Sequence, residues 1–395
     1  MSRQRGLAAL STLMAIMTMG ASVLASDRTD EDLLESMWSS PNDSPALFSD
    51  TFLREVPAEQ IKSVLADFIE RCGDFIAVEA TERAGEFRLI AERCEVPIDI
   101  TRNPDGPIVG LWFHNPVRRD ASLDDLLDEI ASFEGAVSYA LMENGELIAG
   151  HEVDRPMGIG SAFKLIVLAA LVERIEKGEA DWADVVTLKA RHVSLPSGSL
   201  QEMPIGSPFT LHTLAAAMIA QSDNTATDIL IDFVGRERLE AMSGLQPFLT
   251  TREAFQLGGD EAVYARFKAG DLSERYAVLE ELTEAPLPSA NVVSKPWKPE
   301  VEWPLSTRTL CGWIKRVADV DLTQINTGPV RAEGWQQVSY KGGSQIGVLN
   351  LTAHVRDAKG RSFCFSATWN DDGEIDDGPL GSLYASVFHL LKSRP

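Results

Sequence analysis

The stretch MGIGSAFKLIVLAALVERIEKGE, residues 157–179, decides how the second half of the chain is interpreted. A glycine turn leads into an apolar run that ends in polar residues, which predicts a helix. Ser161 and Lys164 are three residues apart, so a helix places them on one face. The spacing suits a nucleophile and its base, but it also arises by chance in long chains. The pair alone therefore does not establish chemistry.

Two further motifs follow in the order that this chemistry requires. S-D-N occupies 222–224, at the break between an apolar helical segment and the helical segment TATDILIDFVG. K-G-G-S occupies 341–344, within VSYKGGSQIGV, which is typical of a strand. S-x-x-K, S-D-N and K-T-G form together the signature of penicillin-recognising serine enzymes. Each motif is weak alone, but the ordered set predicts a serine nucleophile.

On these motifs, residues 121–395 resemble a class A β-lactamase domain. The resemblance implies an α/β fold of the β-lactamase/transpeptidase type, with an antiparallel sheet flanked by helices and an all-helical subdomain. The whole chain resembles the two-domain serine hydrolases of clavulanic acid biosynthesis clusters. That resemblance implies a small α+β domain of the cystatin or steroid-isomerase (NTF2-like) type, with one helix and a curved antiparallel sheet.

The candidate site residues fall into two groups. Those expected to act in catalysis are Ser161, Lys164, Ser222 and Lys341. Those expected to bind substrate are Asn224, Gly343 and Ser344. The helix start favours negative charge developing on Ser161, and burial of Lys164 lowers the pKa of its amine so that it can act as a base. Ser222 is placed to relay a proton, with Lys341 beside it. The resemblance implies an oxyanion hole made by the N–H groups of Ser161 and Ser344.

Structural explanations exist for the same residues. S-D-N is a common helix N-cap, and K-G-G is compatible with a bulged edge strand. We expect Asp223 to be structural in either case, holding its loop through hydrogen bonds to backbone.

Two departures from the family pattern limit the resemblance. Class A enzymes deacylate with a glutamate in an E-x-x-L-N loop, and none follows the S-D-N motif here. Glu253 is the nearest carboxylate, in a segment that is typical of a capped helical turn; without a base, deacylation should be slow. Gly342 replaces the hydroxyl residue that helps bind a β-lactam carboxylate, and Ser344 could supply a substitute. Both departures favour relaxed specificity, as in an esterase.

The sequence before residue 121 is predicted to form three segments. Residues 1–25 carry two arginines, an uncharged run and small residues before an acidic stretch, which is typical of a cleaved signal peptide. Residues 26–45 are polar and turn-rich and are interpreted as a linker. Over 46–120, a helix within 56–73 precedes short alternating runs, which favours an α+β domain with an antiparallel meander.

The domain over 121–395 is predicted to begin with a capped helix, followed by a hairpin around Asn144-Gly145. Helices are predicted over 210–221, 224–243, 251–285 and 306–319. Two closing strands and a final helix follow, so the sheet is assembled from both ends of the domain.

Composition excludes several other classes. The chain has 395 residues, 44% of them hydrophobic, and a net charge of −23, which argues against a nucleic acid or anionic membrane partner. Its six histidines show no zinc-binding spacing, so no metal or cofactor is expected. Four cysteines in an exported protein allow two disulfides; Cys72–Cys94 is favoured over Cys311–Cys364, and four free thiols remain the alternative.

The sequence therefore predicts a periplasmic or secreted serine hydrolase that forms an acyl-enzyme at Ser161. Its expected partner is a small-molecule acyl substrate, such as a β-lactam, an ester or a peptide-like amide, with no stable membrane anchor after cleavage. Two alternatives remain: a D,D-peptidase or transpeptidase of the cell wall, and a β-lactam-binding sensor with slow deacylation. The physiological substrate and the oligomeric state are left open.

Overall fold

The computed structural model describes residues 28–103, 106–294, 298–392 and 394; the expected signal peptide lies outside this range. The chain forms two compact units, Met1–Leu126 with Gly381–Leu390 and Leu127–Leu380 with Leu391–Pro395. Of the helices in the described ranges, none is both long and apolar enough to cross a membrane.

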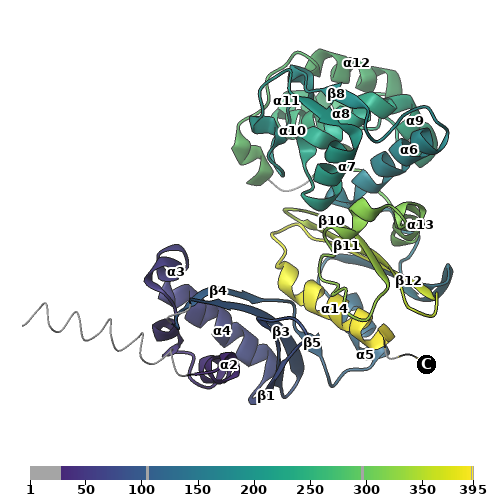
Figure 1. The fold of residues 1–395 in the computed structure, drawn as a ribbon. Coiled ribbons are helices and arrows are strands. Elements are labelled where there is room, and N and C mark those ends of the chain that lie inside the picture. Colours follow the sequence, from purple (N-terminus) through teal and green to yellow (C-terminus); the bar gives the residue numbers. More distant parts are fainter. Residues whose placement is uncertain (1–27, 104–105, 295–297, 393, 395) are drawn as a thin grey trace, which may run out of the picture. The chain divides into compact units, whose positions relative to one another are not determined.

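The first unit is built on an antiparallel meander in the order β1-β2-β3-β4, as the sequence predicted. Its strands are β1 (Phe75–Ala80), β2 (Glu86–Ala91), β3 (Cys94–Arg102), β4 (Ile108–Phe113) and the short β5 (Val117–Arg118), which pairs with β3. Figure 1 shows α4 (Ala58–Cys72) lying along this sheet. A Cys72–Cys94 disulfide joins the end of α4 to the start of β3. The α+β composition expected for this region is thus present.

The linker expected over 26–45 is wrong, because most of it is helical. α2 (Asp30–Ser39) begins with a capping box between Thr29 and Asp32, and its apolar side chains are buried in the core of the first unit. A short 3₁₀ turn, Ser44–Leu47, and α3 (Asp50–Glu55) follow. The polar residues of this segment lie on the helix surface, while its apolar residues pack inward, and that burial stabilises the helix.

The second unit contains a five-stranded antiparallel sheet in the order β10-β11-β12-β6-β7. Its strands are β6 (Ala136–Glu143), β7 (Glu146–His151), β10 (Gln337–Gln345), β11 (Val348–Arg356) and β12 (Ser362–Asn370). The predicted assembly of the sheet from distant parts of the chain is confirmed, since β12 pairs with β6. β10 is an edge strand, so one of its sides is free to border a site.

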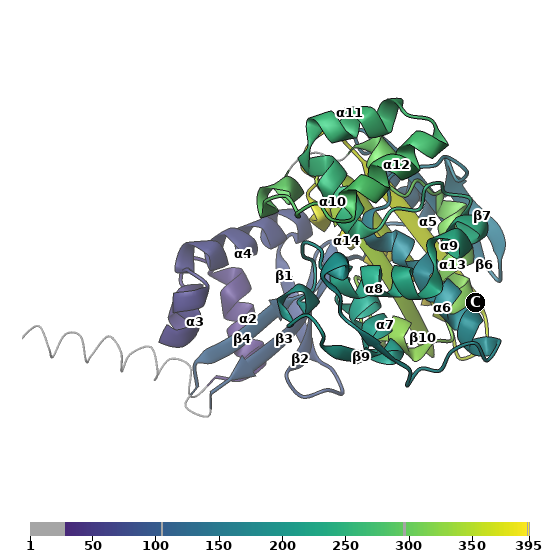
Figure 2. The same cartoon turned by 90° about the horizontal axis from the view of Figure 1, so that it is seen from above.

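Helices gather beside the β10 edge of the sheet, as Figures 1 and 2 show. They are α6 (Lys164–Glu176), α7 (Leu211–Ala220), α8 (Asn224–Val234), α9 (Arg236–Ser243), α10 (Thr251–Gly259), α11 (Glu261–Ala269) and α12 (Leu272–Leu282), with the strand pair β8 (Val185–Thr187) and β9 (Pro208–Thr210). The predicted helices over 224–243 and 251–285 are broken at Gly235, Asp260 and Gly270. α5 (Leu123–Ala131) and α14 (Asp377–Lys392) contribute residues to both units.

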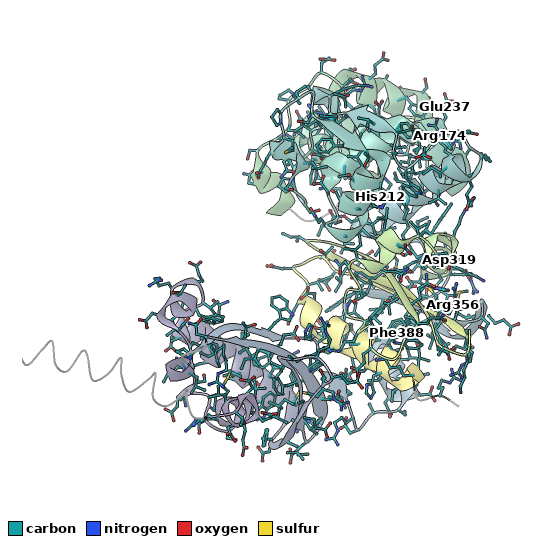
Figure 3. The ribbon with its side chains drawn as sticks, in the orientation of Figure 1. Arg174, His212, Glu237, Asp319, Arg356 and Phe388 are labelled. Atoms are coloured by element: carbon teal, nitrogen blue, oxygen red, sulfur yellow. A yellow bond between two sulfur atoms is a disulfide. The ribbon has the colours of Figure 1, made fainter. Side chains whose placement is uncertain are left out.

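The core of the second unit joins helices and sheet through α13 (Thr307–Val317). A disulfide links Cys311 of this helix to Cys364 of β12. Just beyond the helix, Asp319 pairs with Arg356 of β11 at 2.9 Å, and Figure 3 shows the two side chains close together. These connections hold the sheet, and therefore its β10 edge, against the helical part that carries Ser161.

Candidate active site

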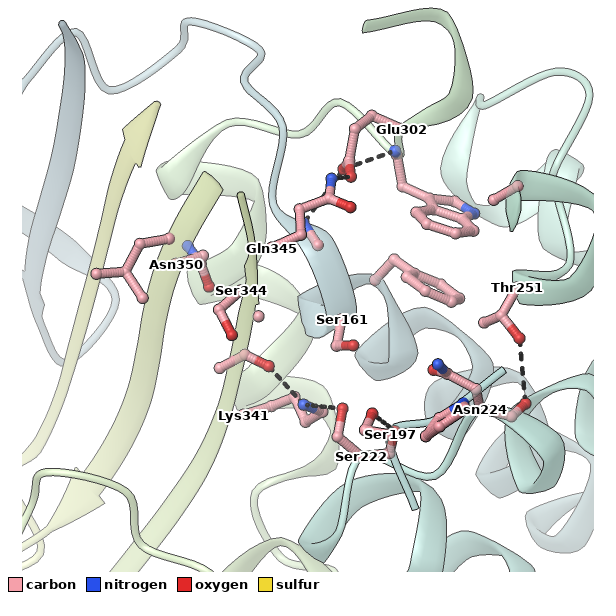
Figure 4. Close-up of a pocket in the computed structure, with 18 of the residues that line it drawn as sticks. Ser161, Ser197, Ser222, Asn224, Thr251, Glu302, Lys341, Ser344, Gln345 and Asn350 are labelled. Carbon is pink, nitrogen blue, oxygen red and sulfur yellow. Dashed lines mark hydrogen bonds between the residues drawn. The ribbon is translucent and has the colours of Figure 1, made fainter. Parts of the chain in front are cut away.

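The nucleophile candidate, Ser161, lies in a 3₁₀ turn (Gly160–Phe163) that leads directly into α6. Two apolar side chains of this turn, Ala162 and Phe163, are buried, and Phe163 stacks on Trp303 with ring centroids 3.8 Å apart. Buried neighbours fix the turn and leave the serine hydroxyl facing outward. Figure 4 shows this hydroxyl pointing into the space bordered by Ser222 and Asn224.

Lys164 follows one turn later and is fully buried, with 0% of its surface exposed. Its Nζ lies 3.1 Å from Ser222 Oγ and 2.7 Å from Asn224 Oδ1, and it also donates to the Ser222 carbonyl. Within the described chain, the amine makes no hydrogen bond to the Ser161 hydroxyl, although the Lys164 backbone N–H donates to the Ser161 carbonyl. Burial, and then the charge of Lys341, holds the pKa of Lys164 well below its ordinary value. The lowered pKa makes the amine easier to deprotonate, as a catalytic base requires.

Ser222 stands between the two lysines. Lys341 Nζ also donates to Ser222 Oγ at 3.1 Å, so one hydroxyl contacts both amines. Burial lowers the pKa of Lys341 to about 7. The charge of Lys341 disfavours a charge on Lys164, and the hydroxyl between the two amines offers a path for a proton.

A strained backbone presents the Ser222 hydroxyl. Its φ of +56° lies in the left-handed region, which a non-glycine residue enters only when its surroundings hold it there. Two donors to its carbonyl supply that support: Ser197 Oγ at 2.6 Å and the amine of Lys164. The strain and the bonds that hold it place the hydroxyl in one orientation.

Asp223 is structural, as the sequence predicted. Its carboxylate accepts from the backbone N–H groups of Ser199, Leu200 and Ala226 at 2.7–2.9 Å, and it is fully buried. A Cβ at Gly198 would lie 2.1 Å from this carboxylate, so only glycine lets the loop approach. Asp223 thereby joins the 197–200 loop to the start of α8.

β10 approaches the nucleophile turn more closely than a side chain would allow. A Cβ at Gly343 would stand 2.1 Å from the Ile159 carbonyl and 2.5 Å from the Ser161 nitrogen, and one at Gly160 would stand 3.1 Å from the Ser344 nitrogen. The backbone N–H groups of Ser161 and Ser344 are therefore brought to neighbouring positions. Two such donors are the arrangement required to stabilise an oxyanion.

A buried carboxylate that the sequence did not single out holds this contact. Glu302 Oε2 accepts from the backbone nitrogens of Ile159 and Gly160 at 3.2 Å each and from that of Trp303 at 3.3 Å, and Oε1 accepts from the side-chain amide of Gln345. Only 8% of Glu302 is exposed, and burial raises its pKa to about 7. It links the residues before Ser161 to the end of β10. No local motif marks it, because its partners are distant in the sequence.

Asp228, another buried carboxylate, fixes the helix that forms the opposite wall. It accepts from the backbone of Thr251 at 2.7 Å, from the Thr251 hydroxyl at 2.9 Å and from the backbone of Arg252 at 2.9 Å. Burial raises its pKa to about 7. Thr251, at the first turn of α10, thereby lines the cavity.

Glu253, the carboxylate nearest to the expected deacylation loop, is directed elsewhere. It pairs with Arg236 at 2.6 Å and closes a capping box with Thr250 at the start of α10. It is not among the described residues that line the cavity, although its neighbours Thr251 and Ala254 are. The expected capped turn is thus present, with Thr250 as the cap.

These residues surround one cavity of about 560 Å³. Six of the seven predicted site residues line it: Ser161, Ser222, Asn224, Lys341, Gly343 and Ser344. Lys164 is buried directly behind, in contact with Ser222 and Asn224. Asn224 donates to the Leu195 carbonyl at 3.0 Å while it accepts from Lys164, so its amide is already engaged on both sides. The described chain contains no group of three His, Cys, Asp or Glu side chains placed to hold a metal ion.

Parts of the chain are similar to known proteins. Residues 119–281 match the model of the β-lactamase enzyme family. A segment of 96 residues, 22% of the chain, is 29% identical to Beta-lactamase 1 of Streptomyces cacaoi and spans 30% of that protein's length. Among solved structures, similar chains include a β-lactamase from Sphaerobacter thermophilus (18% identity, 68% of this chain and 95% of that one, TM-score 0.49) and PBP-A (15% identity, 71% and 100%, TM-score 0.44).

The family match covers Ser161, Lys164 and the S-D-N motif, while Lys341 lies beyond it. Together with the antiparallel sheet and the helices beside it, the match supports a β-lactamase-like α/β fold for the second unit.

Proposed function

We propose that this protein is a serine hydrolase that acts through an acyl-enzyme at Ser161. One observation carries the proposal: the Ser161 hydroxyl faces a cavity in which a second serine hydroxyl bridges two buried lysines at 3.1 Å each. Nucleophilic catalysis by serine needs a base of lowered pKa, a proton relay and donors for an oxyanion. This cavity combines all three.

The chemistry of acylation follows from these positions. Neutral Lys164 takes the proton of the Ser161 hydroxyl, and the oxygen electron pair forms a bond to the substrate carbonyl carbon. The N–H groups of Ser161 and Ser344 stabilise the negative charge that moves onto the carbonyl oxygen. When the intermediate collapses, the bond to the leaving nitrogen or oxygen breaks and the leaving atom takes the proton of Ser222. The Lys164 ammonium then returns a proton to Ser222.

Deacylation is expected to be the slow half of the reaction. A water molecule must lose a proton while it attacks the ester, and the two glutamates near the cavity are committed to other donors. Glu253 is bound to Arg236 and to its own capping box, and Glu302 Oε2 already accepts from three backbone N–H groups. We propose that Lys164 acts as the base in this step as well.

The substrate class we propose is a β-lactam or a related ester or amide, hydrolysed with relaxed specificity. The family match and the similarity to Beta-lactamase 1 of Streptomyces cacaoi support this class. The glycine at position 342, where penicillin-recognising enzymes carry a hydroxyl residue, supports the relaxed specificity.

A second candidate is a D,D-peptidase or a penicillin-binding sensor, in which the acyl-enzyme persists. The orientation of Glu253 away from the cavity favours it, because a site without a dedicated deacylation base retains its acyl group. Release of D-alanine from a peptidoglycan stem peptide would distinguish a peptidase from a β-lactam hydrolase.

Two further parts of the proposal concern the whole chain. We propose that residues 1–25 direct export to the periplasm or the medium and are then removed, which is compatible with the two disulfides. We also propose that the N-terminal domain, over 46–120, is of the cystatin or steroid-isomerase-like type. Its helix and antiparallel meander support that assignment.

Burst and steady-state kinetics test the proposed function. Nitrocefin and a panel of p-nitrophenyl esters would be mixed with the wild type, Ser161→Ala and Glu253→Gln. We expect a burst of one product per enzyme and a slower steady state in the wild type and in Glu253→Gln, and neither phase in Ser161→Ala. An unchanged burst in Ser161→Ala would refute the assignment of the nucleophile.

A further inference from the structure

Tyr340 occupies the space beside Gly342 on β10. A Cβ at Gly342 would lie 2.2 Å from the Tyr340 hydroxyl oxygen, and a Cβ at Gly328 would lie 2.4 Å from its Cζ. The tyrosine ring therefore lies between two glycines, and no side chain fits at position 342 while the ring stays in place. The Tyr340 ring thus fills the space that a hydroxyl side chain at position 342 would occupy.

The phenol group of Tyr340 can donate a hydrogen bond to a ligand. Tyr340 lines the cavity, and its hydroxyl makes no hydrogen bond to any residue in the described ranges. Burial, and then the charge of Asp377, raises its pKa above the ordinary value, so the group stays protonated and can donate. An unpaired donor beside a cavity is stabilised when a bound molecule supplies an acceptor.

The charges at this end of the cavity disfavour an anion. Two cations line the described part of the cavity, and both are engaged: Lys298 pairs with Glu261 at 2.7 Å, and Lys341 donates to Ser222 and to the Gly342 carbonyl. Asp377 lines the cavity near Tyr340 and is exposed. A carboxylate bound beside Tyr340 would therefore lie near the like charge of Asp377. Like charges that share a site repel, and a carboxylate loses its hydration without compensation.

We propose that the subsite formed by Tyr340, Gly342 and Asp377 selects acyl donors whose leaving group carries no anionic group, namely neutral esters and amides. This inference rests on the proposed serine hydrolase function and deepens it. The phenol of Tyr340 donates to a neutral carbonyl or ether oxygen of the leaving group, while Asp377 repels a carboxylate. The ordinary β-lactam antibiotics, which carry that carboxylate, should then acylate this site more slowly than neutral esters do.

The test uses two aryl esters that differ only in charge. The phenylacetylglycyl ester of 3-hydroxybenzoic acid releases an anionic leaving group, and the matching ester of methyl 3-hydroxybenzoate releases a neutral one. Release of the phenol would be followed at pH 7.5 by absorbance with the full-length protein. We expect kcat/KM for the neutral ester to exceed that for the anionic one by about tenfold, after correction for the uncatalysed rates.

Three variants assign the effect to the subsite. Asp377→Asn should raise kcat/KM for the anionic ester several-fold and so bring the ratio of the two esters closer to one. Tyr340→Phe should lower kcat/KM for the neutral ester several-fold. Asp376→Asn is the matched control, because this neighbouring carboxylate caps the Gly378 nitrogen and does not line the described cavity; it should leave the ratio unchanged.

Each remaining outcome counts against the inference. A wild type that prefers the anionic ester, or a ratio that Asp377→Asn does not change, would overturn the subsite while leaving the proposed function in place. No phenol release above the Ser161→Ala background with either ester would overturn the proposed function, and this inference with it.

Discussion

The two ends of the cavity differ in how their polar groups are paired. Around Ser161, both lysines and Glu302 have several partners within the protein, and the backbone is held at close approach. Around Tyr340, a hydroxyl without a partner in the described chain lies near an exposed carboxylate. Polar groups with hydrogen-bond partners in the protein are preorganised, whereas a group without one can bond to a ligand. Changes at the first end should therefore alter rate, and changes at the second should alter the choice of substrate.

The largest effect is expected from Lys164→Met. This change keeps the length and burial of the side chain but removes the base, and loss of a general base lowers rates by roughly 10²–10⁴-fold. We expect acylation by a p-nitrophenyl ester, measured by stopped flow, to fall by about 10³-fold with a normal fold by circular dichroism. Lys359→Met, at an exposed turn, is the control. A loss below tenfold would remove Lys164 from the role of base.

The next prediction concerns pH. Glu302 has a pKa of about 7 in the folded protein against 4.5 for an exposed glutamate, so its contribution to stability is fully present below pH 4.5 and is lost as pH rises through 7. The loss amounts to at most about 3 kcal/mol.

Calorimetry between pH 4.5 and 8 would measure this contribution as the difference in unfolding free energy between wild type and Glu302→Gln. We expect the wild type to lose unfolding free energy relative to Glu302→Gln as pH rises. Asp228→Asn should behave in the same direction, since that carboxyl also has a pKa of about 7. A difference that stays constant with pH would mean that Glu302 does not titrate in this range.

Gly343→Ala should separate β10 from the nucleophile turn, because the added methyl group would lie 2.1 Å from the Ile159 carbonyl. Loss of one oxyanion donor lowers rates by about 10²–10³-fold, so we expect acylation to fall by about 10²-fold. The control is Gly312→Ala in α13, where an added Cβ meets no atom within 4 Å. Equal rates in the two variants would contradict the close approach of the two segments.

The smallest effect on rate is expected from Glu302→Gln. The amide nitrogen cannot accept a hydrogen bond, so one of the four donors around residue 302 loses its partner. We expect kcat to fall by about tenfold with KM almost unchanged, because the residue positions the oxyanion donors and does not contact substrate. Glu253→Gln, the matched control outside the cavity lining, should keep the wild-type kcat. A change confined to KM would assign Glu302 to substrate binding.

The sequence identifies the acyl-transfer end of the cavity far better than the other end. Ser161, Lys164 and Ser222 are marked by short motifs, since helix and turn geometry fixes neighbours three residues apart. Glu302 and Tyr340 carry no such mark. The role of Glu302 depends on backbone 142 residues away, and the ring of Tyr340 is held partly by Gly328, which folding brings to it. Only the folded chain could supply those contacts.

The helix α2 was missed by the sequence-based prediction for a different reason. The polar, turn-rich residues that follow it favour a linker in the sequence, yet Leu33, Leu34 and Met37 lie on one buried face and Thr29 with Asp32 forms a capping box. Both signals were present, and the apolar spacing outweighs the polar composition when a core is available to cover it. The meander of the first unit was predictable because alternation and turn residues agree there.

The most direct test of the central claim is intact mass spectrometry after exposure to an acyl donor. Wild type and Ser161→Ala would be incubated with a fluorescent penicillin and with a p-nitrophenyl ester, quenched in acid and weighed, and the labelled peptide sequenced. Acylation at Ser161 predicts one acyl group per chain, located within residues 157–179, in the wild type and none in the variant. An equal adduct in Ser161→Ala, or a label on another residue, would contradict the account.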